Sequence, residues 1–156
     1  TGPCSVALSP TITLGQTVNG TLATTDCRLD DGSYADGYRI QVATTTNVQI
    51  DLTSTTFDTW LILLELLSTG VLLERGFNDD VSATNSDSRL TFAMNAGSTY
   101  YIVANSFDPN VTGPYTLTTI AVAADQGAAR REATGRSVPK RGSKPSVSVL
   151  IRKLRP

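Results

Sequence analysis

The chain has 156 residues, 40% of them hydrophobic, which is enough for one globular domain and an appendage. It contains no histidine, which excludes Ser-His-Asp and Cys-His nucleophilic catalysis, and no apolar run approaches the roughly 20 residues that span a bilayer. The net charge of −1 hides an uneven division: residues 1–124 carry four basic and twelve acidic side chains, and residues 125–156 carry nine basic and two acidic ones. This predicts an acidic body (net −8) and a basic tail (net +7) that can attract copies of the molecule head to tail.

The first half of the body is predicted to form short strands separated by turns. Strict alternation of apolar and polar residues, typical of strands with one buried face, occurs in segments 17–23, 38–42 and 47–52. An acidic loop over residues 25–37 separates the first two. Residues 60–67 are almost continuously apolar, which favours a central strand of a sandwich, although this length also allows two helical turns. The turn at residues 68–70 favours a hairpin.

The second half of the body repeats this pattern. A polar loop is expected over residues 77–87 and a tight turn over residues 95–98. Further strands are expected at segments 89–93, 100–104 and 115–122. Seven or eight strands at this spacing predict an all-β fold, an antiparallel β-sandwich over residues 1–124.

The composition changes after Ala124, so residues 125–156 are predicted to be a separate basic linker and tail. Residues 126–144 have almost no large apolar side chains, whereas residues 146–151 alternate again and predict one additional strand. The candidate residues of this assembly strand and its surroundings are Val147, Val149, Leu150, Ile151 and Leu154. The candidate basic contacts are Arg130, Arg131, Arg136, Lys140, Arg141, Lys144, Arg152, Lys153 and Arg155.

The basic tail has other interpretations. Binding of nucleic acid is not expected, because the tail has no aromatic residue for base stacking and the acidic body would repel phosphates. Binding to anionic lipid is disfavoured because residues 146–151 have the pattern of a strand and not of an amphipathic helix. The alternative is a solvated tail without a partner, which is typical of this composition.

Two cysteines and two sequons suit an exported protein. Cys4 and Cys27 are predicted to form a disulfide, the alternative being two free buried thiols. Asn19 and Asn110 begin the motifs Asn-Gly-Thr and Asn-Val-Thr, which are candidate glycosylation sites. We therefore expect an extracellular or cell-surface location.

Aspartate side chains in two predicted loops are candidates for a metal site. Carboxylate oxygens on loops suit Ca²⁺, and the candidate ligands are Asp26, Asp30, Asp31, Asp36, Asp79 and Asp80. The alternative is that these residues only cap turns. Adjacent acids such as Asp79 and Asp80 point apart in an extended chain, which argues against a glycosidase pair. Trp60, Tyr34 and Tyr38 are candidates for a sugar-binding platform, the alternative for Trp60 being the core.

A set of short motifs in a fixed order spans residues 11–122. The motifs are Gly-Gln-Thr-Val at 15–18, Gly-Thr-Leu at 20–22, Asp-Gly-Tyr at 36–38, Ser-Thr-Thr-Phe-Asp at 54–58, Leu-Ile-Leu-Leu at 61–64, Asn-Asp-Asp at 78–80, Asp-Ser-Arg-Leu at 87–90, Tyr-Tyr-Ile-Val at 100–103 and Gly-Pro-Tyr-Thr-Leu at 113–117. Together they resemble the bacterial pre-peptidase C-terminal domain family. The resemblance implies an extracellular jelly-roll β-sandwich, generally non-catalytic and usually appended to secreted peptidases or other exported proteins. The tail has no counterpart in the family pattern.

These observations lead to two functional hypotheses. The first is a non-enzymatic extracellular structural subunit that assembles with copies of itself into a filament, its tail docking on, or donating a strand to, the neighbouring acidic sandwich. The second is an accessory domain of a secreted peptidase or other exported hydrolase that binds its substrate, glycans or calcium.

Overall fold

The computed structural model describes residues 5–124. Within this range the chain forms one short 3₁₀ helix, η1 (Val6–Leu8), and nine strands. The strands are β1 (Thr17–Leu22), β2 (Cys27–Arg28), β3 (Tyr34–Ile40), β4 (Thr46–Thr53), β5 (Thr59–Leu66), β6 (Leu72–Asn78), β7 (Ser88–Met94), β8 (Thr99–Ser106) and β9 (Gly113–Ala121). The all-β prediction is confirmed. The predicted tail strand lies outside the described residues.

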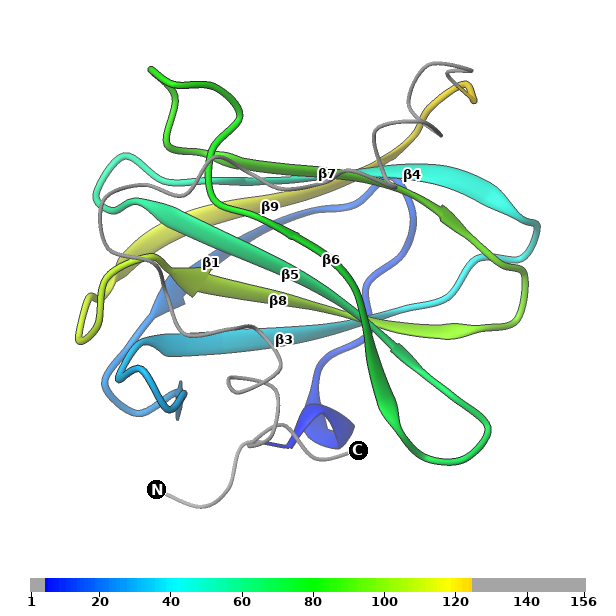
Figure 1. Ribbon diagram of the computed structural model, residues 1–156, viewed down its shortest axis with the longest axis horizontal. Coiled ribbons are helices and arrows are strands. Elements are labelled where there is room, and N and C mark those ends of the chain that lie inside the picture. The colour runs from blue at the N-terminus through cyan, green and yellow to red at the C-terminus, as the bar shows by residue number, and fades with distance from the viewer. Residues whose placement is uncertain (1–4, 125–156) are drawn as a thin grey trace.

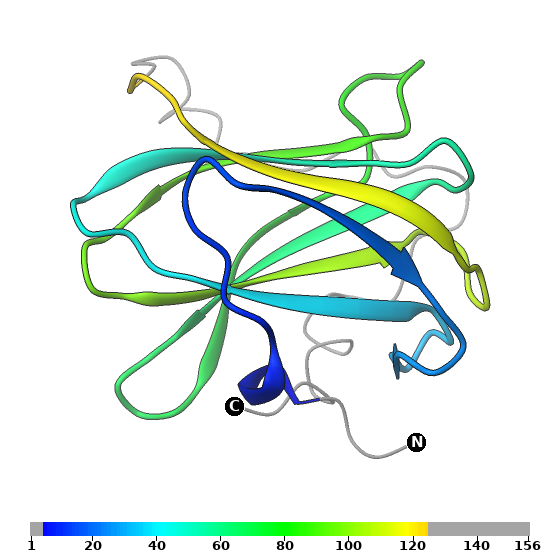
Figure 2. The same ribbon diagram turned by 180° about the vertical axis from the view of Figure 1, so that it is seen from behind.

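The strands form two antiparallel sheets packed face to face (Figure 1). One sheet has the order β1-β9-β4-β7 and faces the viewer in Figure 2; the other has the order β2-β3-β8-β5-β6. Within residues 5–124, only β2–β3 and β5–β6 are consecutive strands of one sheet, and every other connection crosses between the sheets. This order is that of a jelly roll, which confirms the β-sandwich prediction.

The main core lies between the sheets because alternate residues of each strand point inward. Ile50 and Leu52 of β4 meet Leu61 and Leu63 of β5 in this layer, and all four are fully buried. The apolar run that begins at Trp60 is a strand, as predicted, and not a helix. Residues Thr59 to Glu65 are all buried, so β5 is covered on both faces. A strand buried on both faces needs the continuous apolar run that the sequence shows.

The predicted loop over residues 25–37 is wrong in part, because β2 and the first half of β3 lie inside it. Asp36 and Gly37 resemble turn residues, but the tertiary structure holds both in a strand. Asp36 accepts a hydrogen bond from Tyr115 of β9. A Cβ atom at Gly37 would lie 2.4 Å from the Ser9 hydroxyl, so a larger residue there would displace the Ser9 side chain next to η1. The predicted loop from residue 77 also begins too early, since β6 extends to Asn78.

Candidate functional site

The five-stranded sheet has a second apolar cluster on the side that faces away from the core. Its members alternate with the inward-facing residues of β3, β5 and β8. We call this surface the outer face and define it by Ala35, Trp60, Ile62, Leu64, Tyr101 and Val103. Each of these side chains is 5% exposed or less. A sheet that ordinarily faces water on one side carries polar residues there, so this composition marks a surface built to be covered.

Trp60 lies at one end of the outer face. Its ring stacks on Phe77 of β6 with a centroid distance of 5.3 Å and contacts Phe107 at 5.7 Å. Tyr38 and Tyr34 instead pack with the core between the sheets. The three aromatic residues considered for a sugar platform are therefore on opposite sides of the sheet and do not form one platform.

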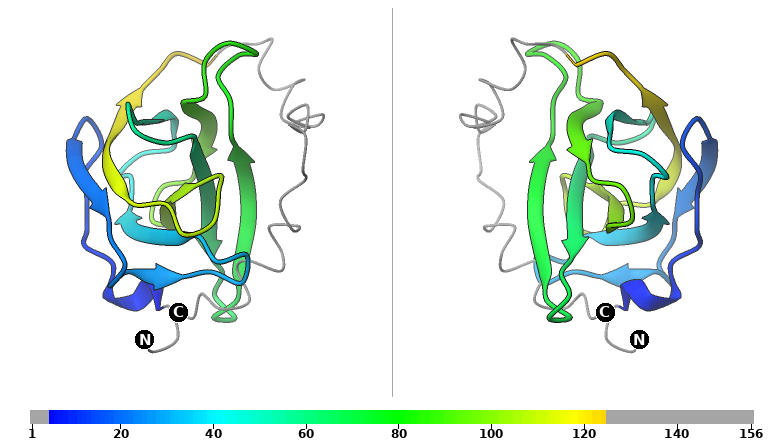
Figure 3. Two further views of the ribbon diagram at one scale, coloured as in Figure 1. Left: turned by 90° about the vertical axis from the view of Figure 1, so that its left-hand side faces the viewer. Right: turned by 90° about the vertical axis from the view of Figure 1, so that its right-hand side faces the viewer.

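Three described segments outside the strands pack with the outer face. In residues 5–124, the segments outside the strands that join this cluster are η1 with Val6, the loop after β2 with Leu29, and the β8–β9 loop with Phe107. In residues 5–124, no further sheet or long helix forms a third layer outside the five-stranded sheet (Figure 3).

One end of this sheet is acidic. Thr59 at the start of β5 pairs with Ser106 at the end of β8, Ala35 near the start of β3 pairs with Asn105, and Leu61 pairs with Asn78 at the end of β6. The connections at these strand ends therefore meet at one end of the sheet. Of the seven carboxylates in these connections, Asp87 lies next to β7 of the other sheet. The other six make up what we call the acidic end: Asp30, Asp31, Asp58, Asp79, Asp80 and Asp108.

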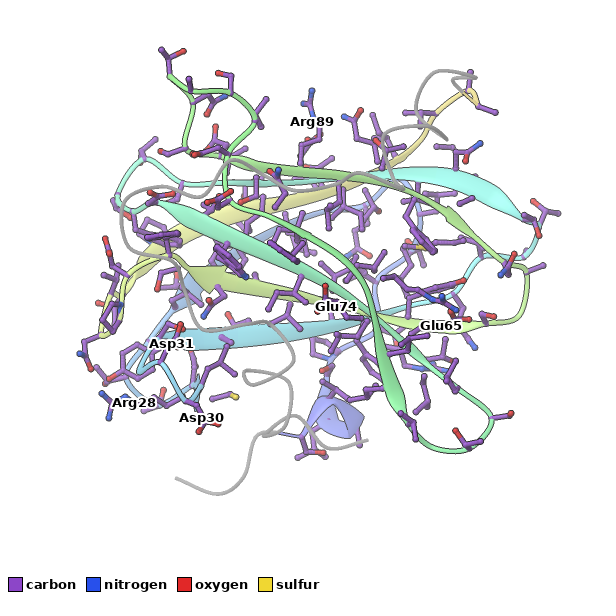
Figure 4. All side chains as sticks on the ribbon, viewed as in Figure 1. Arg28, Asp30, Asp31, Glu65, Glu74 and Arg89 are labelled. Carbon is purple, nitrogen blue, oxygen red and sulfur yellow. The ribbon has the colours of Figure 1, made fainter. Side chains whose placement is uncertain are left out.

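The charges around the outer face are unevenly balanced. Arg28 is at the acidic end, where its guanidinium donates to the Asn110 side chain at 2.6 Å and to the Gly32 carbonyl (Figure 4). At the other end of the sheet, Arg75 pairs at 2.5 Å with the buried Glu65, which lies on the inward side of β5 opposite Tyr100. Glu74 pairs with Leu64 across the strands and thus lies on the outer face, near the middle of β6 in Figure 4. Burial raises the pKa of its carboxyl above the ordinary value.

The candidate calcium ligands do not form a single metal-binding group in the part of the chain that the structure describes. Asp26 accepts a hydrogen bond from the Ala23 amide at 2.5 Å, Asp31 accepts from the amide and hydroxyl of Ser33, and Asp36 points into the sandwich. Asp79 is 2% exposed, and its Oδ1 has no hydrogen-bond partner in residues 5–124. No three acidic or thiol side chains in that range come together in a group that could hold a metal ion. Calcium binding stays a prediction.

The opposite face of the sandwich is polar. Thr17 of β1 and Thr118 of β9 form a hydroxyl pair at 3.1 Å, and Thr116 donates to Asn19 at 3.1 Å. A shallow groove of about 450 Å³ lies beside them, with Asp87 and Ser54 on its wall. Asn19 is exposed here, and Asn110 is exposed in the β8–β9 loop, so both sequons can be reached by a glycosyltransferase. Glycosylation stays a prediction.

A buried polar network joins the two sheets near this groove. The Tyr115 hydroxyl donates to Asp36 Oδ2 at 2.6 Å, which leaves the Tyr38 hydroxyl, 2.5 Å away, to donate to Tyr115. Burial raises the pKa of Tyr115 far above 10.0, and its hydrogen bonds to Asp36 and Tyr38 raise it further. Burial likewise raises the pKa of Tyr38 and of Asp36. Both phenols of the network, Tyr38 and Tyr115, therefore keep their protons to higher pH than an exposed tyrosine does.

We expect this network to make the fold sensitive to alkali. Below pH 10 the phenols of both states keep their protons; above about pH 10 the unfolded chain loses them while folded Tyr115 does not, so the free energy of unfolding falls by roughly 1.4 kcal/mol per pH unit for this phenol. Denaturant unfolding from neutral pH to about pH 11 measures this slope. Tyr115→Phe should lower the stability at neutral pH and flatten the alkaline decline. An unchanged alkaline slope in this variant would contradict the role given to Tyr115.

No helix in residues 5–124 is long and apolar enough to span a membrane. No family model matches the sequence, and no curated protein matches it.

Solved structures do match the fold. The pre-peptidase C-terminal domain of a collagenase from Bacillus anthracis is similar at 20% identity with a TM-score of 0.54, over 71% of this chain and 93% of that domain. A surface-associated copper-binding protein of Methylomicrobium album is similar at 7% identity with a TM-score of 0.52, over 73% of this chain and 98% of that protein. Likeness at these identities establishes the fold, which is that of the pre-peptidase C-terminal domain, as the motifs predicted.

Proposed function

We propose that this protein is a non-enzymatic, extracellular structural subunit that assembles head to tail into a filament. In this proposal the basic tail of one copy docks on the acidic body of the next. The observation that carries it is the acidic end, where the register of the five-stranded sheet gathers six carboxylates with Arg28 beside them. The nine basic residues of the tail are the matching charges within the same chain.

The residue types support a role without catalysis. The sequence has no histidine to act as a base near neutral pH, and in residues 5–124 its two cationic pairs join Arg75 to Glu65 and Arg89 to Asp51 on separate strands. The sequons at Asn19 and Asn110 support an extracellular location.

Charge alone does not hold such a contact together. Exposed ion pairs contribute about 0–1 kcal/mol each, whereas fixing a residue's backbone costs about 1–2 kcal/mol. Burying Val147, Val149, Ile151 and Leu154 would add roughly 1.5–3 kcal/mol apiece. A contact between two different surfaces does not close on itself, so repeating it produces an open fibre.

Negative-stain microscopy of the intact chain beside a version ending at Ala124 tests this function. We expect fibres from the intact chain only, with fewer fibres as salt is raised, because the attraction is screened. Val149→Asp should abolish the fibres while circular dichroism still reports a folded β-sandwich, because an aspartate cannot be buried in an apolar contact. The matched control is Thr91→Asp, which adds the same charge on β7 of the other sheet and should leave assembly intact. Fibres of ordinary length from Val149→Asp would contradict tail-driven assembly.

A second function is favoured by the fold itself. Its likeness to the pre-peptidase C-terminal domain of a collagenase suggests an accessory domain of a secreted peptidase or other exported hydrolase, binding a substrate, glycan or calcium. Monodisperse particles from both the intact and the shortened chain would favour this function over the filament. Binding to collagen, to glycans and to Ca²⁺ would then be measured by calorimetry.

We also propose the disulfide between Cys4 and Cys27. Cys27 is half-buried in β2, and residues 5–124 contain no free thiol; Cys4 lies outside the described residues. The expected result is that a thiol reagent labels neither cysteine in the unfolded, non-reduced protein and labels both after reduction. Labelling without reduction would show two free thiols instead.

A further inference from the structure

The shallow groove beside Thr116 lies on the polar side of the four-stranded sheet, the side that faces the viewer in Figure 2. Gly20 of β1 pairs with Tyr115, and Thr53 of β4 pairs with Thr116, so the first residues of β9 form a floor between two walls. The volume of about 450 Å³ falls in the range of roughly 300–1,000 Å³ that is usual for small-ligand sites. Because the groove is shallow and open to solvent, it also suits one segment of a longer chain.

Hydrogen bonds hold both walls of the groove in place. On one side, the Ser54 hydroxyl donates to the Pro114 carbonyl at 2.9 Å, and the Ser54 amide donates to Asp87 Oδ1 at 3.1 Å. These two bonds join the end of β4 to the start of β9 and to the residue before β7. On the other side, the Thr116 hydroxyl donates to Asn19 Oδ1 at 3.1 Å. A groove that is fixed in this way loses little conformational entropy when a ligand binds.

Several polar groups that line the groove have hydrogen-bonding capacity to spare. Asp87 uses Oδ1 for the Ser54 amide, and its Oδ2 forms no hydrogen bond or ion pair within residues 5–124. Asn19 likewise uses its side-chain oxygen, and its amide nitrogen remains a donor. The hydroxyls of Thr21, Thr53 and Thr55 form no hydrogen bond in the same part of the chain. The groove therefore offers a carboxylate acceptor, an amide donor and hydroxyls that can do either.

This set of groups identifies a class of ligand. A metal cation would need several carboxylates, and Asp87 is the single one among the described residues that line the groove. An anion would be repelled by Asp87, with no Lys or Arg in the same lining to offset it. An apolar ligand would leave the polar groups without partners. A neutral compound with many hydroxyls satisfies them all, because each hydroxyl can donate to Asp87 or accept from Asn19.

We propose that this groove binds a segment of a neutral saccharide chain, with Asp87 accepting hydrogen bonds from sugar hydroxyls and Asn19 donating to another. The inference rests on the accessory function proposed above, because it names the ligand class and the surface, and it is independent of the filament. Pro114 is exposed on the floor and offers an apolar patch to the C–H groups of a sugar ring. The ring of Tyr115 is buried beneath the floor, so the described lining provides no aromatic platform. We therefore expect a dissociation constant on the order of 1 mM.

Nuclear magnetic resonance titration of the isotope-labelled full chain tests the site. Cellohexaose, maltohexaose and chitohexaose are added in separate titrations, with Asn19 unmodified because a glycan on its nitrogen would fill the groove. We expect at least one of these neutral oligosaccharides to produce saturable shifts of the amide resonances of Gly20, Thr21, Thr53 and Thr55. The resonances of the five-stranded sheet should not move. Absence of groove shifts with all three oligosaccharides would overturn the proposal.

Variants test the chemistry of the groove. Asp87→Asn keeps an acceptor for the Ser54 amide but removes the charge, and it should weaken binding about 10-fold or more. Thr53→Val removes a hydroxyl and should weaken binding roughly 2- to 10-fold. The matched controls are Glu74→Gln on β6 of the other sheet and Thr91→Val on β7, neither of which lines the groove. Both should bind as the original chain does, and equal weakening by variants and controls would refute the roles given to Asp87 and Thr53.

The groove and the accessory function fail in different ways. Saturable shifts on the five-stranded sheet only, unchanged by Asp87→Asn, would overturn the groove and keep a glycan-binding accessory domain. Groove shifts produced by Ca²⁺ or by a collagen peptide, and by none of the oligosaccharides, would overturn the ligand class. No response to the oligosaccharides, to collagen peptide or to Ca²⁺ would contradict the groove and the accessory function together.

Discussion

Leu63→Ala is expected to lower the free energy of unfolding by about 2–5 kcal/mol, the usual cost of emptying a fully buried leucine site. Leu63 lies in the middle of β5, is 0% exposed, and points into the core between the two sheets. Its neighbours across the sheet are Ile102 of β8 and Gly76 of β6. Neither can fill the space, because Ile102 is itself buried and Gly76 has no side chain. The site therefore collapses poorly, which favours the upper part of this range.

The measurement is equilibrium denaturation in urea, compared with Leu73→Ala. Leu73 lies on β6 and is 38% exposed, so the same substitution there removes fewer buried atoms and should cost less than about 1.5 kcal/mol. Similar losses at both positions would show that the core is not centred between the sheets as described.

Gly20→Ala should be the most disruptive small substitution in the described chain. Gly20 of β1 pairs with Tyr115 of β9, and a Cβ atom at residue 20 would lie 2.3 Å from the tyrosine ring. The ring cannot swing away freely, because its hydroxyl is held by Asp36 and Tyr38. Overpacking costs roughly 1–3 kcal/mol, and the disturbed bond to a carboxylate adds about 1.5–3 kcal/mol. We expect a total loss of about 2.5–6 kcal/mol.

Thermal or urea unfolding of Gly76→Ala gives the matched control. A Cβ atom at Gly76 would meet Leu90 at 3.5 Å, an ordinary contact, so this variant should retain nearly the stability of the original chain. Adding Tyr115→Ala to Gly20→Ala should make the glycine substitution almost neutral in a double-mutant cycle. A full cost of Gly20→Ala without the tyrosine ring would refute the proposed clash.

The sequence was informative where a strand has one buried face or two. Alternation located β1, β4 and β7, and the apolar run that begins at Trp60 located β5. It was misleading at Asp36 and Gly37, a turn-like pair that lies in β3. Asp36 accepts a hydrogen bond from Tyr115, and Gly37 lies against Ser9, and both partners are distant in sequence. Local patterns carry no information on such partners.

The candidate site also combines a feature that local sequence patterns indicate with one that depends on residues distant in sequence. The apolar run that begins at Trp60 predicted a central strand, and the structure adds that β5 is buried on both faces. The acidic end was not predicted, because its six aspartates are dispersed over almost eighty residues of sequence and meet only through the register of β3, β5, β6 and β8. Four of the calcium candidates belong to this end, but in residues 5–124 no three acidic or thiol side chains form a group that could hold a metal ion.

The pairing of β1 with β9 has a consequence for the order in which the protein folds. Thr17 lies beside Thr118, so the first and last strands of the sandwich are neighbours although about a hundred residues separate them. A chain with so many distant pairings closes large loops before it gains contacts, and we expect folding in milliseconds to seconds and not in microseconds. β1 has no sheet partner other than β9, so a nascent chain cannot complete its four-stranded sheet until residue 121 has been synthesised. The tail emerges only after every strand of the body is available.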